Sequence, residues 1–254
     1  MLLYGWVGVS MRYMIDFSYS GWNFYGYQKQ PLKRTIQGEI EVVLTSINGG
    51  DKVIIYSSGR TDAKVNAYHQ VAHFDLDKKI PENKLKMALN SYLPNDIYIN
   101  DVRIVDSSFH ARYMVKSKTY EYKINIGTYN PMIRTFTYYH KYKLNVEKMK
   151  EALKYFVGTH DFTTFVCAED KRTDKVRTIY SSDLSLKDNI ITIKFTGNGF
   201  LKYQVRNMVG LLIKIGEEKI SLEEIPNLFK KKDRRCKFNC APAEGLSLLE
   251  VNYK

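Results

Sequence analysis

Cysteine is scarce in this sequence, which has only Cys167, Cys236 and Cys240 among its 254 residues. A sparse, odd-numbered set excludes a disulfide framework and predicts reduced thiols, the state that the cytoplasm maintains. Cys236 and Cys240 lie close together, but no nearby pair of histidines or cysteines completes a tetrahedral zinc site. The sequence therefore predicts no metal centre.

Long apolar runs are also missing, because no uncharged apolar segment is long enough to cross a bilayer, so we expect no membrane association. The first ten residues are apolar but lack a basic segment and a small-residue cleavage site, which makes them a poor signal peptide. Strand-like sequence follows directly at Met11, so we expect residues 1–10 to be a floppy extension or the product of an upstream start. We assign the protein to the cytoplasm.

Acidic residues are outnumbered, with 27 Asp and Glu against 39 Lys and Arg and a net charge of +12. A field of that sign concentrates polyanions, and nucleic acid is the commonest polyanionic partner, although a solvated lysine-rich surface explains the charge equally well. The 20 tyrosines suit RNA, because unstacked bases need flat partners, but tyrosine is also common in strands. Composition alone leaves both interpretations open.

Hydrophobic periodicity divides the chain into two halves of similar order, with no Pro-rich linker between them. In the first half, an apolar stripe from Ile36 to Ile47 predicts a helix that ends at Asn48-Gly49-Gly50, and Pro81 opens a second helix. Strands are expected at 12–17, 53–57, 70–75 and 97–105.

The second half repeats this order. Apolar stripes predict helices over 146–156 and from Val205 to Leu212, and Ser221-Leu222-Glu223-Glu224 is a capping box that starts an extra helix. Strands are expected at 118–126, 176–186, 190–195 and 246–251, the middle two forming a hairpin.

Each half thus follows the order β-α-β-β-α-β, the ferredoxin-like unit. We expect an α+β protein with two tandem ferredoxin-like halves, residues 11–108 and 109–254. Joined edge to edge, they form a continuous, mainly antiparallel sheet with helices on one face and a catalytic cleft between the halves. The open face of such a sheet is a known platform for RNA, although many ferredoxin-like domains bind none.

The segment 59–74 is the strongest candidate for a catalytic segment, because it places Asp62 and Arg60 in a loop between two expected strands. The carboxylate can reach into a cleft, and the neighbouring guanidinium can hold a phosphate or pair with it. Taken alone, however, the loop is more typical of an Asx turn with a surface ion pair.

The same segment resembles the hallmark of the TruA-type pseudouridine synthases, approximately G-R-T-D-A-G-V-H-A followed by G-Q-V-A-H-F. The chain matches this pattern at 59–63, Val65, Ala67 and 70–74. Further blocks resemble the family in its own order, at 25–30, 93–97, 109–112, 161–165, 177–179, 200–201, 205–210 and 243–246. The resemblance therefore covers the chain from about residue 11 to its end.

The resemblance implies that Asp62 is the essential aspartate of a tRNA pseudouridine synthase, which breaks the uridine N1–C1′ bond and rejoins the base through C5. A carboxylate suits this reaction because it can attack a sugar carbon, stabilise positive charge there or remove a proton. Arg60 and Thr61, in the same matched block, are expected to hold the nucleotide. Tyr120 is expected to stack on the base, and Arg206 to pair with Asp62. No step requires a cofactor.

The family acts on the anticodon stem-loop of tRNA, at positions 38 to 40, and functions as a homodimer, so the resemblance implies both for this chain. Three basic clusters are candidates for contacts with tRNA, although a solvated surface is the commoner explanation of such clusters. They are Lys230-Lys231-Lys232, Arg234-Arg235 and Lys171-Arg172.

The chain departs from the family pattern at Ser20, Trp22, Tyr27, Lys64 and Asn66. If position 64 adopts the left-handed conformation that its usual glycine allows, the lysine costs roughly 1–2 kcal/mol. These departures leave open an alternative, a catalytically impaired protein of the same fold that binds or remodels tRNA. A hydrolase acting on another glycoside is a weaker alternative, because no second acid accompanies Asp62 in the loop.

Overall fold

The computed structural model describes residues 10–167, 172–233, 235 and 238–254. The expectations for residues 1–9, for Lys171, for Arg234 and for Cys236 lie outside the described residues. Within them, no helix combines the length and apolar character needed to span a membrane.

The N-terminal half forms a ferredoxin-like unit. Its strands stand in the order β4-β1-β3, with the short β2 paired to β3, which is the spatial order of that unit. Its elements are β1 (Met11–Tyr19), α1 (Ile36–Ile47), β2 (Tyr56–Ser57), β3 (Asn66–Leu76), α2 (Glu82–Tyr92) and β4 (Ile97–Ile104).

The C-terminal half repeats the arrangement, with its principal strands in the order β10-β5-β9-β8. These elements are β5 (Ser117–Asn125), α3 (Val146–Leu153), β8 (Val176–Lys187), β9 (Ile190–Gly197), α4 (Gln204–Gly216) and β10 (Leu246–Asn252). The half also contains β6 (Tyr138–Tyr139), β7 (Gly158–Asp161) and α5 (Glu224–Lys231).

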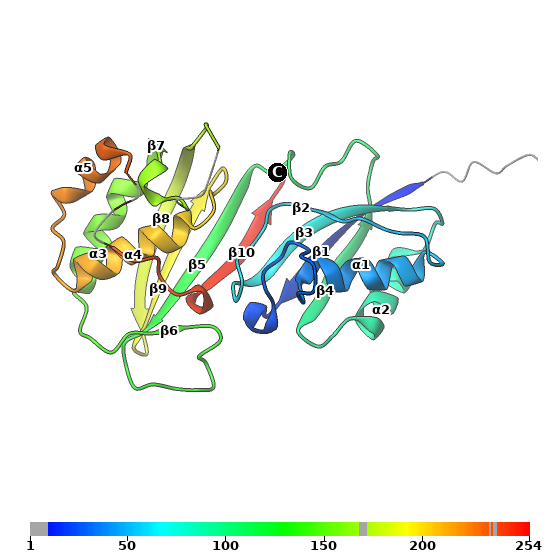
Figure 1. The fold of residues 1–254 in the computed structure, drawn as a ribbon, viewed down its shortest axis with the longest axis horizontal. Helices are drawn as coiled ribbons and strands as arrows, with labels where there is room; N and C mark the ends of the chain where they lie inside the picture. The colour runs from blue at the N-terminus through cyan, green and yellow to red at the C-terminus, as the bar shows by residue number, and fades with distance from the viewer. Residues whose placement is uncertain (1–9, 168–171, 234, 236–237) are drawn as a thin grey trace, which may run out of the picture.

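The two halves join where β3 lies beside β10, so that the described strands form one ten-stranded sheet (Figure 1). This contact is parallel and short, pairing Ser247 with Asn66 and Leu248 with Ala67. Farther along, the same edge of β3 pairs instead with β2, at His73. The loop between β2 and β3 therefore emerges at the junction of the halves.

Local signals account for the helix ends. The Thr35 side chain accepts a hydrogen bond from Gly38 N at the start of α1, which satisfies a backbone donor that the helix leaves free. Gly49 and Gly50, with φ of +78° and +100°, then turn the chain away after α1, as expected from their freedom in the left-handed region. The Asn145 side chain caps α3 by accepting from Lys148 N.

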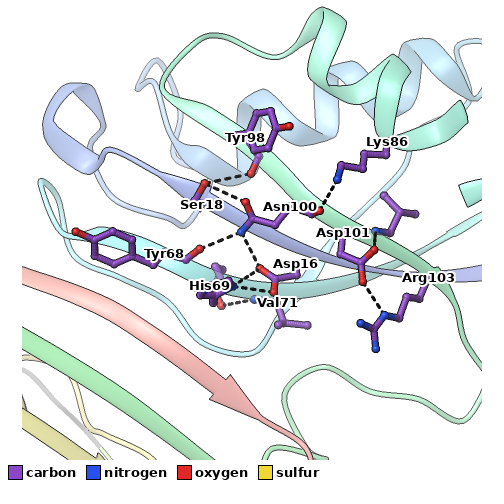
Figure 2. Close-up of polar contacts among 12 residues, drawn as sticks. Asp16, Ser18, Tyr68, His69, Val71, Lys86, Tyr98, Asn100, Asp101 and Arg103 are labelled. Carbon is purple, nitrogen blue, oxygen red and sulfur yellow. Dashed lines mark hydrogen bonds and ion pairs between the residues drawn. The ribbon is translucent and has the colours of Figure 1, made fainter. Parts of the chain in front are cut away.

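One face of the sheet packs against the core along β1, and the other is polar. Along β1, alternate residues such as Tyr13, Ile15 and Phe17 are fully buried, as the period of a strand requires when one face packs against helices. On the opposite face, Asn100 Nδ2 donates to Asp16 Oδ1 at 3.0 Å, and His69 Nδ1 lies 2.9 Å from Asp16 Oδ2 (Figure 2). This network ties β1, β3 and β4 together.

The α+β architecture is confirmed, with corrections to element ends. The run 53–57 is a strand only at its last two residues, and β3 begins at Asn66 rather than Gln70. The helix expected over 146–156 changes to a 3-10 turn after Leu153. The extra helix α5 begins at Glu224 with Glu223 at its N-cap, three residues after the expected start at Ser221, whose N lies 3.5 Å from the Glu224 carboxylate.

Candidate active site

The loop between β2 and β3 forms part of a cleft of about 1050 Å³ whose walls come from both halves. The volume suits a nucleotide-sized ligand. All five residues expected at the site line this cleft, and they are Arg60, Thr61, Asp62, Tyr120 and Arg206. The fold thus brings together residues as far apart in the sequence as Asp62 and Arg206, which are 144 positions apart.

An ion pair crosses the cleft between the loop and helix α4. Arg206 Nη1 donates to Asp62 Oδ2 at 3.1 Å, and the two side chains are 15% and 21% exposed. Arg206 Nε also donates to the Ala241 carbonyl at 2.8 Å, and the guanidinium lies 5.0 Å from the ring of Tyr203. These contacts fix the orientation of the guanidinium so that its Nη1 is directed at the Asp62 carboxylate.

The electrostatic state of Asp62 follows from two opposing effects. Burial raises the pKa of the Asp62 carboxyl, because a carboxylate loses hydration inside the protein. The positive charges of Arg206 and Lys202 act in the opposite direction and favour the ionised form. The carboxylate is therefore poorly hydrated but charge-compensated, a combination that is common at catalytic sites.

Thr61 is directed toward the interior of the protein. Its hydroxyl shares a hydrogen bond of 2.8 Å with Tyr19 Oη, whose pKa burial raises to about 12. The Thr61 carbonyl accepts from Tyr27 N at 3.1 Å. Gly26 lies so close that an added Cβ would come within 3.1 Å of the Thr61 carbonyl oxygen. The block 25–30 therefore packs its backbone against the loop, and the φ of +98° at Gly26, in the left-handed region, favours glycine there.

Arg60 and Tyr120 differ in their surroundings. Arg60 is exposed where it lines the cleft, so its guanidinium is accessible to an anionic ligand. Tyr120 is 8% exposed, and its ring stands edge-on to Phe200 with centroids 5.2 Å apart. Burial raises the pKa of Tyr120, so the hydroxyl remains protonated at neutral pH.

Two departures from the family pattern contact each other. Lys64 adopts φ of +65°, the left-handed conformation considered for this position. Its ammonium lies 4.7 Å from the ring of Trp22, at another departure, and the Arg134 guanidinium lies 4.8 Å from the same ring. A cation–π contact of this kind contributes roughly 0.5–1 kcal/mol at an exposed site and so offsets part of the backbone strain.

Asn66, which stands where the family has histidine, has a structural role. It is 2% exposed, its Oδ1 accepts from Gly21 N and its Nδ2 donates to the Thr135 carbonyl, both at 2.8 Å. An added Cβ on Gly21 would come within 2.1 Å of the Val65 carbonyl oxygen. Asn66 therefore holds two segments against the end of the loop that carries Asp62.

The cleft residues that sequence reasoning missed include Lys118, Lys202 and Tyr203. Tyr203 has φ of +67° at the N-cap of α4, which could not be read from its residue type. Lys118 could have been found, because it stands two positions before Tyr120 on one strand, and such residues share a face.

Some residues of the basic clusters form ion pairs, and another lines the cleft. Lys232 pairs with Asp161 at 2.8 Å and Arg235 with Asp233 at 3.1 Å, while Arg172 lines the cleft. Cys167 is a buried free thiol, and the described residues contain no group of three or more potential metal ligands.

Comparisons with known proteins identify the family of this chain. The chain matches the model of a family described as tRNA pseudouridine synthase over residues 17–114 and 152–254. It is 44% identical to the tRNA pseudouridine synthase A of Geobacillus sp. (strain WCH70) over 246 residues, covering 96% of this chain and 99% of that protein. It is 43% identical to the enzyme of the same name from Anoxybacillus flavithermus, over 95% and 98% of the two chains.

Two observations define the class of this protein. Its two joined ferredoxin-like halves contribute an aspartate and an arginine to one cleft, and its sequence matches tRNA pseudouridine synthases over nearly the whole chain. The chain belongs to the tRNA pseudouridine synthase family. It is an isomerase that acts on uridine in tRNA.

The contact between Lys64 and Trp22 makes a prediction about stability. In a Trp22→Ala background, Lys64→Gly should stabilise the protein by about 1 kcal/mol, because it relieves left-handed strain. In the wild type the gain should be smaller, since the same change also removes the cation–π contact. Urea denaturation of the wild type, the two single variants and the double variant measures the effect of Lys64→Gly in both backgrounds. Equal destabilisation by Lys64→Gly in both backgrounds would contradict the backbone strain at position 64.

Proposed function

We propose that this enzyme converts uridine to pseudouridine in the anticodon stem-loop of tRNA, at positions 38 to 40, with Asp62 as its catalytic residue. The observation that carries the proposal is the Asp62 carboxylate, held 3.1 Å from Arg206 inside a cleft between the two halves. A poorly hydrated carboxylate in a basic cleft is suited to a reaction at a sugar carbon of a polyanion.

The reaction is an isomerisation and consumes no second reactant. The N1–C1′ bond breaks, the uracil turns, the C5–C1′ bond forms, C5 loses its proton and N1 gains one. Attack at C1′ and removal of the C5 proton both require the ionised form of Asp62. The ion pair with Arg206 favours that form and fixes the carboxylate in one place.

The other cleft residues suit the handling of the nucleotide. The exposed guanidinium of Arg60, two residues before Asp62, is placed to bind a phosphate beside the target nucleotide. The flat ring of Tyr120 gives the detached uracil a surface to stack on during its turn. Thr61 holds the loop through Tyr19 and so acts on the substrate through the position of its neighbours.

The choice of the anticodon stem-loop rests on the family resemblance and on the physics of RNA recognition, since loops present unstacked bases that a cleft can take up. We also propose, from the resemblance, a homodimer in the cytoplasm. Sedimentation of the purified protein should give twice the mass of one 29.7 kDa chain, and a monomer at enzymatic concentrations would contradict the dimer.

The alternative of a catalytically impaired binding protein arose from Lys64 and Asn66. Both residues are accommodated, Lys64 by Trp22 and Asn66 by two hydrogen bonds, and the Asp62–Arg206 pair is intact. These contacts favour an active enzyme.

Replacement of the carboxylate tests the catalytic role directly. Asp62→Asn should lower pseudouridine formation on an unmodified tRNA transcript by roughly a thousandfold or more, because the neutral amide can neither attack nor accept a proton. Binding of the tRNA should persist. The readout is the mapping of pseudouridine by position, with filter binding of the same transcript.

Product from the wild type only, confined to positions 38 to 40, would support the whole proposal. Product elsewhere in the tRNA would overturn the choice of the stem-loop, and tRNA binding without product would favour the impaired binding protein. Release of free uracil would instead indicate a hydrolase.

The pH dependence tests the ion pair. Since burial raises the pKa of Asp62 and Arg206 opposes this, removing the guanidinium should raise that pKa further. Arg206→Gln should therefore move the acidic limb of kcat to higher pH, because the carboxylate becomes protonated earlier as the pH falls. At neutral pH the rate should drop by about a hundredfold through lost positioning.

Rates across the acidic range for the wild type and Arg206→Gln provide the measurement. The matched control is Lys214→Gln on the same helix, because the Lys214 ammonium pairs with Glu217 rather than with Asp62. This variant should leave the acidic limb of the kcat profile at its wild-type pH. An unshifted limb in Arg206→Gln would show that Asp62 is not the group that titrates.

A further inference from the structure

Lys118 makes a second link between the C-terminal half and the catalytic loop. It lies on β5, two residues before Tyr120, and its Nζ donates to the Ser58 carbonyl at 2.6 Å. Ser58 is 2% exposed and stands four residues before Asp62, at the start of the loop. The loop is therefore held from the C-terminal half at its start by Lys118 and at its carboxylate by Arg206.

The N-terminal half supports the same start of the loop through Gln70, a residue with no exposed surface. Gln70 Nε2 donates to the Gly59 carbonyl at 3.1 Å, and Gln70 Oε1 accepts from Ser58 Oγ at 2.6 Å. These bonds use the side chain of Ser58 and the carbonyl of Gly59. Lys118 instead holds the carbonyl of Ser58, so Gln70 and Lys118 bond different groups at the start of the loop.

The surroundings of Lys118 are unusual for a lysine. Within the described part of the chain, no carboxylate lies within ion-pair distance of its ammonium. Burial, assisted by the charge of Arg112, lowers the pKa of Lys118 to about 8. Keeping an ammonium charged where burial has removed part of its hydration costs free energy. Lysines with a shifted pKa are concentrated at functional sites.

We propose that Lys118 is a positioning residue for the isomerisation, holding the Ser58 carbonyl so that the loop presents Asp62 to C1′ of the target nucleotide. The inference rests on the proposed role of Asp62. Its physical basis is the steep dependence of rate on geometry, since a displacement of about 1 Å at a catalytic group costs on the order of a hundredfold.

Gly59 provides an independent way to break this hydrogen bond. A Cβ added at Gly59 would lie 2.5 Å from Lys118 Nζ, the mobile end of a flexible side chain, and 3.9 Å from Lys118 Cε. Gly59 is also absent from the residues with positive φ, so alanine meets no left-handed strain there. Gly59→Ala should therefore displace the ammonium from Ser58 while leaving the charge in the protein.

Lys118→Met removes the ammonium but keeps most of the side chain. Its terminal methyl corresponds to Lys118 Cε, which a Cβ at position 59 would meet only at ordinary contact distance. Gly59→Ala should therefore disturb the wild type but fit without conflict in the Lys118→Met protein. The two changes form a double-mutant cycle that isolates the contact.

The experiment measures kcat and KM for pseudouridine formation on an unmodified tRNA transcript by the wild type, both single variants and the double variant. Each single variant should lower kcat by roughly ten- to a hundredfold and change KM by less than about twofold. The double variant should be no slower than Lys118→Met alone. Lys123→Met, on the same strand and paired with Glu121, is the control and should retain the wild-type kcat.

Three results would overturn the proposal. The first is an unchanged kcat in Lys118→Met. The second is an equal cost of Gly59→Ala in both backgrounds, which would reflect a general disturbance of the loop. The third is a raised KM with unchanged kcat, which would place the ammonium on an RNA phosphate instead.

Thermal melting of each variant separates lost positioning from lost folding, and if Lys118→Met fails to fold, Lys118→Leu takes its place in the same cycle. Absence of product from the wild type would mean failure of the proposed function, a result distinct from any of these.

Discussion

The ion pair between Asp62 and Arg206 is the interaction on which the cleft depends. Its carboxylate belongs to a loop of the N-terminal half and its guanidinium to helix α4 of the C-terminal half, 144 residues later. Such a pair forms only when both halves are folded and joined. Burying a lone charge of either sign would be costly, so each residue depends on the other for its place.

The anchoring of the arginine extends this dependence into the C-terminal half. Arg206 donates to the Ala241 carbonyl, and its own carbonyl accepts from Ala241 N at 3.0 Å. One turn farther along α4, Gly210 has no side chain because a Cβ there would come within 1.9 Å of the Asn239 carbonyl oxygen. The close approach of the segment around Ala241 to α4 thus sets the direction in which the guanidinium points.

Much of this arrangement could be predicted from the sequence, because it follows from local periodicity and from short motifs. The helix from Ile36 to Ile47 was predicted to the residue, since its apolar stripe and its glycine stop signal are local features. The start of β3 was missed by four residues, because its first residues are ordered by parallel pairing with β10, at the far end of the chain. Lys118 was missed because a lysine in a strand resembles a surface residue until its burial is known.

The distribution of positive charge around Asp62 bears on how the enzyme would work once tRNA is bound. Phosphates that approach the exposed cation Lys202 neutralise it, and this removes part of the field that favours the ionised carboxylate. Arg206 is less subject to this loss, because it is only 15% exposed and its fork is already engaged by Asp62 and Ala241. A partly buried arginine can therefore keep the carboxylate charged while the surface cations are taken up by the substrate. On the proposed mechanism, this separates the cations that bind RNA from the one that maintains the catalytic group.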